Sequence, residues 1–240
     1  MISLELKKEK RTGLTAILLI SGILGAAYVL VNFAIRGDSL LSMPANPMDI
    51  LLTQLYGIVM VINMFAIVVA TSIAYNMEYA GAAVKKMYVL PISMKKIYSS
   101  KFLIILTAFL VSVAFEGLAL AWIGVNRLGP GAFRADVFLL FMLYTYITSL
   151  PVASFMLFIS SLSENIWVTI GIGVGGFLSG MALVNMSDSI LMMLHPFIIM
   201  FKPAVAMSAR INGTVMSAAI IETVMFFIAG ILGSSKKKAE

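Results

Sequence analysis

The stretch EYAGAAVKKMYVLPISMKKIYSSK, residues 78–101, carries five lysines and one glutamate between two long apolar segments. The apolar segments cover residues 50–77 and 102–125, and the second is interrupted only by Glu116. Each is long enough to cross a bilayer as a helix, which takes roughly 20 apolar residues. The charged stretch is therefore expected to be a connection that leaves the membrane between two spans.

Composition places the chain among integral membrane proteins. It has 240 residues, of which 61% are hydrophobic and 12% charged, whereas a water-soluble domain carries about 25% charged residues. The absence of cysteine excludes disulfides and thiolate chemistry, and a single histidine, His195, excludes a histidine metal cluster. The length fits one compact bundle, so residues 1–240 are expected to form a single transmembrane domain.

Six segments are long and apolar enough to span a bilayer. Helices are expected, because an open sheet would leave backbone groups unpaired in lipid. The predicted fold is an all-α integral membrane protein with six transmembrane helices. The six spans cover residues 13–35, 50–77, 102–125, 137–163, 165–187 and 212–235.

The distribution of lysine and arginine predicts the orientation. An even number of spans places both termini on one side, together with residues 78–101. That side carries twelve basic residues, and the other carries five: Arg36, Arg127, Arg134, Lys202 and Arg210. Because cytoplasmic segments are enriched in lysine and arginine, both termini are predicted to be cytoplasmic. The basic residues are dispersed over three short segments, which favours contact with anionic membrane lipid over nucleic-acid binding.

The last external connection, residues 186–211, has an unusual pattern. It contains ILMMLHPFIIMF (190–201), which is apolar but too short to span, and it is interrupted by Pro196 and Pro203. Such a segment is predicted to be re-entrant or interfacial. His195 is interpreted as an interfacial residue.

Residues 79–90 predict a short amphipathic helix, because Ala80, Val84, Met87 and Tyr88 fall on one face. Pro91 ends it, since the residue before a proline avoids the α region. Ser93 offers a capping oxygen for a new helix from Met94 that runs into the third span. Two interpretations remain: a helix that lies on anionic lipid, or a docking element for a cytoplasmic partner.

The charged stretch resembles the loop after the second span in ABC-2 type transporter permeases, where it forms a coupling helix. The length, the six spans and the basic N-terminal segment resemble this family too, and most of all its lantibiotic and peptide-immunity permeases. The residues that carry the resemblance are Glu78, Gly81, Lys85, Leu90, Pro91, Ile92, Ser93, Lys95 and Lys101.

The resemblance implies a type V exporter-like permease that is not itself an enzyme. Residues 78–101 would be the cytoplasmic coupling loop and residues 1–12 an elbow segment on the membrane surface. Two permeases, identical or homologous, would bind a dimer of ABC ATPase subunits, which hold ATP and Mg²⁺; this chain carries no P-loop motif and no cofactor is expected in it. The implied location is a bacterial plasma membrane. The implied ATPase-coupling residues are Glu78, Gly81, Lys85, Lys86, Met87, Leu90 and Pro91.

Two acids, Glu116 and Glu222, lie near the middle of the third and sixth spans. A charge at mid-bilayer costs roughly 2.5–3.5 kcal/mol on insertion scales. Each glutamate must therefore face the bundle, a polar partner or water, or be protonated. They are interpreted either as gating or substrate-path residues, or as structural hydrogen-bonding groups.

The resemblance predicts export of a membrane-active peptide, such as a lantibiotic or similar bacteriocin, as self-protection or resistance. The alternative cargo is another hydrophobic molecule: a drug, a lipid or an endogenous amphipathic peptide. A membrane enzyme or scaffold is disfavoured, because no His, Asp, Ser and Lys cluster occurs at one depth. The external side lacks an acidic funnel, so a cationic peptide is expected to arrive from the membrane and to be held by apolar contacts.

Overall fold

The computed structural model describes residues 2–9, 12–79, 93–185 and 194–236, and all its regular elements are helices. The predicted all-α fold is thereby confirmed. In chain order the elements are α1 (Ile2–Glu9), α2 (Leu14–Leu41), α3 (Pro47–Asp49), the π-helical turn η1 (Ile50–Gln54), α4 (Gly57–Tyr79), α6 (Met94–Arg127), α7 (Ala135–Leu162), α8 (Ile166–Leu183), α9 (Pro196–Val205) and α10 (Gly213–Lys236).

Six of these segments are long and apolar enough to cross a membrane, which confirms the predicted number of spans. The second span runs from Pro47 to Tyr79 through α3, η1 and α4. It begins earlier than predicted because Asn46 caps it: the Asn46 side chain accepts a hydrogen bond from the Met48 amide at 2.9 Å, and Pro47 occupies the first turn. A side-chain oxygen at the cap and a proline just inside are the usual start of a helix.

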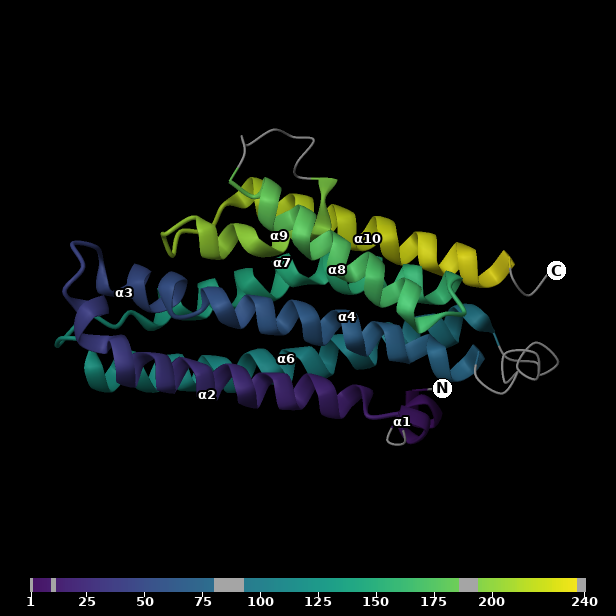
Figure 1. Cartoon of the computed structure of the whole chain (residues 1–240), viewed down its shortest axis with the longest axis horizontal. Coiled ribbons are helices and arrows are strands. Elements are labelled where there is room, and N and C mark those ends of the chain that lie inside the picture. Colours follow the sequence, from purple (N-terminus) through teal and green to yellow (C-terminus); the bar gives the residue numbers. More distant parts are fainter. Residues whose placement is uncertain (1, 10–11, 80–92, 186–193, 237–240) are drawn as a thin grey trace.

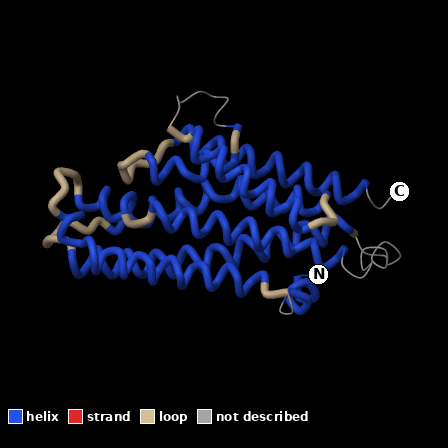
Figure 2. The backbone as a smooth tube through the Cα atoms, in the orientation of Figure 1, coloured by secondary structure: helices blue, strands red, loops and turns tan. Residues whose placement is uncertain are grey.

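The long helices run side by side along the length of the molecule (Figures 1 and 2). Helices α2 and α6 pack together, and α4 joins this pair to α7. Helix α7 in turn packs against α9 and α10, while α8 lies against α4 and α9. The core is therefore shared among α2, α4, α6, α7 and α9, and α8 and α10 lie at its margin.

The N-terminal and C-terminal ends lie at the same end of the bundle, beside the start of α6 (Figure 1). The connections 42–46 and 128–134 lie at the opposite end. This agrees with the prediction that both termini share one side. The cytoplasmic assignment of that side stays a prediction.

The N-terminal basic segment forms the helix α1, which is seen end-on next to the start of α2 (Figure 1) and packs against α6. It therefore lies across the bundle axis instead of extending α2. Gly13 makes this change of direction possible, because it adopts the left-handed conformation, with φ of 76°, that a side chain disfavours.

The start of α6 at Met94 matches the sequence prediction, but the predicted capping by the Ser93 side chain is wrong. The Ser93 side chain makes no capping hydrogen bond. Its backbone carbonyl instead accepts from the amides of Lys96 and Ile97 at 3.0 and 3.3 Å. The predicted helix over 79–90 falls almost entirely in 80–92, outside the described residues.

Within 186–211, the structure shows the short apolar helix α9 and does not describe 186–193. Pro196 occupies the first turn of α9, where a proline is tolerated because its missing N–H has no helical partner. Phe197 to Phe201 are all buried. Ten residues of helix reach about 15 Å, so α9 is too short to span, as predicted. Its re-entrant or interfacial position stays a prediction.

Small residues allow the closest helix approaches. In α8, a Cβ on Gly171 or Gly175 would meet open space. The close approaches are at Gly173, which faces Val68, and at Gly176 and Gly180, which face Phe197. The spacing of glycines identifies a helix that can pack closely, but not which of its faces does so.

The contact between α2 and α6 brings one helix against the backbone of the other. A Cβ on Gly22 would lie 2.5 Å from the Cα of Ser112. Nearby, the Ser112 hydroxyl donates to the Leu18 carbonyl oxygen at 2.5 Å. A small residue facing a hydroxyl that bonds across helices is a common form of packing in membranes.

We predict that Gly22→Ala destabilises the bundle by about 1–3 kcal/mol, the usual cost of overpacking a close contact. The obstacle is the backbone of α6, which cannot rotate away. Thermal unfolding of the purified chain in detergent measures this. Gly171→Ala is the matched control and should leave the unfolding temperature unchanged or slightly higher. Equal effects of the two substitutions would contradict the α2–α6 packing.

Candidate functional site

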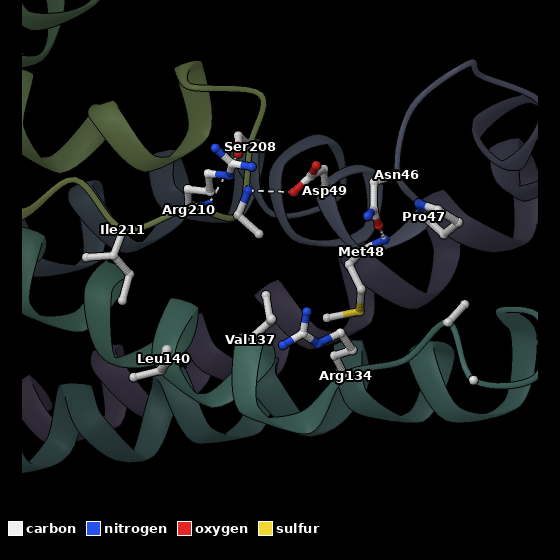
Figure 3. A pocket seen from close by; sticks show the side chains of 13 residues that line it. Asn46, Pro47, Met48, Asp49, Arg134, Val137, Leu140, Ser208, Arg210 and Ile211 are labelled. Atoms are coloured by element: carbon white, nitrogen blue, oxygen red, sulfur yellow. Dashed lines mark hydrogen bonds between the residues drawn. The ribbon is translucent and has the colours of Figure 1, made fainter.

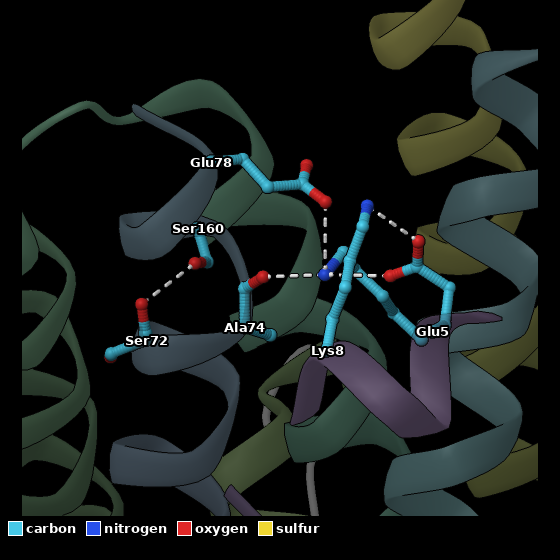
Figure 4. A network of polar contacts seen from close by, with 7 residues as sticks. Glu5, Lys8, Ser72, Ala74, Glu78 and Ser160 are labelled. Atoms are coloured by element: carbon cyan, nitrogen blue, oxygen red, sulfur yellow. Dashed lines mark hydrogen bonds and ion pairs between the residues drawn. The ribbon is translucent and has the colours of Figure 1, made fainter. Parts of the chain in front are cut away.

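A buried ion cluster joins the two ends of the charged stretch 78–101 (Figure 4). It lies at the end of the bundle where both chain termini are found (Figure 1). Its centre is the ammonium group of Lys101 on α6, whose side chain is 4% exposed. The Nζ atom lies 3.1 Å from an oxygen of Glu78 on α4 and 3.2 Å from an oxygen of Glu5 on α1. It also donates to the carbonyl oxygen of Ala74 on α4 at 2.7 Å. Lysine offers three N–H donors, and these three oxygen atoms surround it.

Two further groups complete the cluster. The Lys8 ammonium group donates to the second oxygen of Glu5 at 2.9 Å, and its side chain is half exposed. The Nζ atom of Lys101 also lies 5.4 Å from the centre of the Tyr75 ring, within the range of a cation–π contact. Two carboxylates and two ammonium groups balance each other, so the cluster carries no net charge.

Because the cluster is buried, each of its charged groups must stay next to its partner. A buried ion pair is often no more stabilising than an apolar replacement, but removal of one partner is costly because the other charge stays buried. Lys101 therefore holds α1, α4 and α6 in one arrangement. A displacement of any of these helices would leave a carboxylate or the ammonium group without its partner.

A second contact anchors the same end of α4. The Tyr79 hydroxyl donates to the carbonyl oxygen of Ser161 on α7 at 2.6 Å. A weaker contact, from the Ser160 hydroxyl to the Ser72 carbonyl oxygen at 3.4 Å, lies nearby (Figure 4). The segment 80–92 thus leaves from a residue pair, Glu78 and Tyr79, that is tied to α1, α6 and α7.

The predicted coupling residues divide into two groups. Glu78 is among the residues that the structure describes. It is buried in the cluster and is not exposed on the surface. The others lie outside the described residues: Gly81, Lys85, Lys86, Met87, Leu90 and Pro91. Sequence reasoning included Lys101 but missed Glu5, because an acid in a basic helix gives no sign of its partner 96 positions further along the chain.

The intramembrane acid Glu116 is buried in α6 and has two partners on the second span. Its carboxylate oxygen Oε2 accepts from the Tyr56 hydroxyl at 2.7 Å and from the Asn63 side-chain amide at 2.9 Å. The carboxyl group also packs against α2, where a Cβ on Gly25 would lie 2.7 Å from Oε1. The geometry thus matches the structural hydrogen-bonding interpretation of Glu116. Tyr56 and Asn63 were missed, although a polar asparagine within an apolar span is itself a signal.

Glu222 on α10 has a different environment. It is 2% exposed, and neither carboxyl oxygen has a hydrogen-bond partner among the described residues. Its neighbours along the α7-facing strip of α10 are Ala219 and Phe226, and Phe226 packs on Phe155 of α7 at a centroid distance of 5.0 Å. Glu222 is therefore a buried acid without a hydrogen-bond partner among the described residues, which is costly in this conformation.

At the end of the bundle opposite the termini, three connections border a cavity of about 760 Å³ (Figure 3). The bordering segments are 46–49, 131–140 and 208–211. The oxygen Oδ1 of Asp49 accepts a hydrogen bond from the Ala209 amide at 2.7 Å, which ties the second span to the segment before α10. Arg134 is paired with Asp136 at 2.6 Å. The walls are apolar at Val137, Leu140 and Ile211.

Within the described residues, no group of three or more His, Asp or Glu side chains is placed to hold a metal ion. The buried charged groups are the Lys101 cluster, at one end, and two separate acids within the membrane span.

Comparison with known families agrees with this description. The family model for ABC-2 family transporter proteins matches residues 1–180, which include α1 to most of α8. The chain therefore belongs to the ABC-2 transporter family. Members are the membrane subunits of transporters, and membership implies association with an ABC ATPase. A search of curated proteins gives no match.

We predict that Lys101→Met destabilises the chain by about 3–5 kcal/mol, because Glu5 and Glu78 would remain buried without their common partner. Thermal unfolding in detergent is the measurement. Lys8→Met serves as the matched control and should cost less than about 1 kcal/mol, since Lys8 is half exposed. Adding Glu78→Gln to Lys101→Met should restore part of the loss. Strictly additive losses would argue against the cluster.

Proposed function

We propose that the chain is the permease of a bacterial ABC exporter that removes a membrane-active peptide, such as a lantibiotic, from the membrane. The observation that carries the transport part of this proposal is the Lys101 cluster at the base of the loop that resembles a coupling helix. Both ends of that loop, Glu78 and Lys101, meet in one buried ion pair. A force applied to the loop would therefore reach α1, α4 and α6 together.

In the proposed mechanism, residues 80–92 dock into a separate ATPase dimer, which binds ATP and Mg²⁺. Lys85 and Lys86 would contact the ATPase surface, and Leu90 and Pro91 would end the docking helix. Closure of the ATPase pair would move the loop, and the anchored ends of α4 and α6 would carry the motion into the bundle. A second permease, identical or homologous, would complete the transporter, with the termini in the cytoplasm.

The charges at the opposite end support delivery of the cargo from the membrane. Two acids at that end are already engaged, since Asp49 binds the Ala209 amide and Asp136 pairs with Arg134. Asp38 is the remaining acid among the described residues at that end, and one carboxylate makes no acidic funnel for a cationic peptide. By contrast, α2, α8 and α10 expose broad apolar faces, with only 33%, 17% and 22% of their most apolar stretches buried. An amphipathic peptide in the bilayer can reach such faces directly.

Resistance of living cells tests the cargo. Cells that produce this chain with its ATPase should survive higher concentrations of a pore-forming lantibiotic than cells that lack it. The protection should change little with ionic strength, because the contacts are apolar. Steep loss of transport with added salt, which screens charge contacts, would contradict membrane delivery. Protection against hydrophobic drugs but not peptides would select the alternative cargo.

Two control variants separate coupling from cargo recognition in this assay. An ATPase whose hydrolysis is inactivated should abolish protection and leave the complex intact. Charge reversal at Lys85 and Lys86 should abolish protection and also reduce recovery of the ATPase with the chain. Charge reversal at Lys7, which lies exposed on α1, is the matched control and should retain both.

We predict opposite outcomes for glutamine at the two intramembrane acids. Glu116→Gln keeps an acceptor oxygen for Tyr56 and Asn63, so it should retain resistance. Glu222→Gln should lower resistance, because a buried acid without a partner here is proposed to find one, or to meet cargo, in another state of the transport cycle. The measurement is resistance at matched membrane levels of the two variants. Full resistance with Glu222→Gln would remove that residue from gating.

A further inference from the structure

A second cavity, of about 520 Å³, lies between α2 and α6. The ends of the two helices that line it are remote from the termini (Figure 1). Its lining comes from residues 30–38 of α2 and 122–127 of α6. It shares no lining residue with the cavity bordered by Asp49 and Arg134. It also lies outside the Lys101 cluster and the two intramembrane acids, so none of the groups described above uses it.

One acid and one base line this cavity. Asp38 comes from the last turns of α2, and Arg127 is the last residue of α6. Both residues are exposed, and neither belongs to an ion pair among the described residues. A carboxylate and a guanidinium group in one cavity offer complementary positions for a ligand that carries a cation and an anion close together.

The rest of the lining is apolar and open to the lipid side. Ile35 is 77% exposed and Trp122 is 53% exposed. One turn further into the membrane on each helix, Val31 and Leu118 are also exposed. Two apolar stripes therefore lead from the cavity along α2 and α6 towards the bilayer centre. Tryptophan is favoured at the level of lipid headgroups, which places the cavity at the membrane–water interface.

We propose that this cavity binds the headgroup of a phospholipid that carries a primary ammonium group next to its phosphate. Arg127 contacts the phosphate, because guanidinium groups match phosphate geometry. Asp38 accepts hydrogen bonds from the ammonium group, and a charge-assisted bond of this kind is stronger than a neutral one. The acyl chains lie along the stripes that begin at Ile35 and Trp122. The site needs only a position at a membrane–water interface, so headgroup binding is expected whichever side of the membrane this end faces.

The combination of groups distinguishes this ligand from related ones. A free phosphate ion would gain Arg127 but would meet apolar walls and the negative charge of Asp38. An anionic lipid such as phosphatidylglycerol leaves Asp38 without a cationic partner. Phosphatidylcholine has a quaternary ammonium group, which has no N–H to donate to Asp38. Phosphatidylethanolamine provides partners for both charged residues.

The two tryptophans of the chain allow a direct test, since Trp122 lines the cavity and Trp167 lies at the start of α8. The full chain carrying Trp167→Phe is reconstituted in vesicles that contain a small fraction of lipid with brominated acyl chains. Bromine quenches tryptophan fluorescence only at short range. Brominated phosphatidylethanolamine, phosphatidylcholine and phosphatidylglycerol are compared at equal fraction in the same background lipid.

We expect phosphatidylethanolamine to be enriched next to Trp122 about two- to five-fold over the other two lipids. This is the binding ratio that corresponds to the usual free energy of an exposed ion pair. Asp38→Asn and Arg127→Gln should each abolish the preference. Arg36→Gln, two residues from Asp38 on α2 but not in the lining, should preserve it. A chain with Trp122→Phe, which reports from Trp167, should show equal quenching by all three lipids.

Two results would overturn the proposal. Equal quenching of Trp122 by the three lipids would show that the cavity holds no specific headgroup. Stronger quenching by phosphatidylglycerol would show that Arg127 acts alone, and Asp38 would have no role. Peptide resistance is not part of this measurement, so failure of the proposed cargo would leave its outcome unchanged.

Discussion

An ammonium group buried at the end of a helical bundle must be surrounded by oxygen atoms, since burial removes it from water. In this chain the ammonium group belongs to Lys101, and its oxygen atoms come from Glu5, Ala74 and Glu78. The requirement joins the three helices α1, α4 and α6 at one buried point. It also fixes the distance between the end of α4 and the start of α6, from which the segment 80–92 leaves. The proposed coupling to an ATPase depends on that fixed base.

Further along the bundle, close packing also holds α6 against its neighbours. Gly22 and Gly25 bring α2 against α6, and Glu116 occupies the contact beside Gly25. The carboxyl group of Glu116 then reaches Tyr56 and Asn63 on the second span. Two of the helices that the Lys101 cluster joins at one end, α4 and α6, are therefore joined again within the membrane. A motion that enters through α4 and α6 would move them largely as one unit.

On the other side of the bundle, fewer polar contacts join the helices. Helix α10 packs on α7, but its buried acid Glu222 has no partner among the described residues. Helix α8 receives Phe197 of α9 at Gly176 and Gly180 and exposes most of its surface. This contrast between a hydrogen-bonded half and an apolar half is compatible with transport, in which one group of helices shifts against another.

Composition and patterning by themselves determined that the chain crosses a membrane, how many times it does so, and that both termini lie at one end. These follow from the length of apolar runs, because lipid admits only helices with satisfied backbones. The resemblance of 78–101 also pointed to the family. Only the tertiary structure decided that Glu5 meets Lys101, that Glu116 is bound while Glu222 is not, and that Gly176 packs where Gly175 does not. Partners far apart in sequence are chosen by helix rotation and crossing, and a single sequence does not encode that geometry in any local pattern.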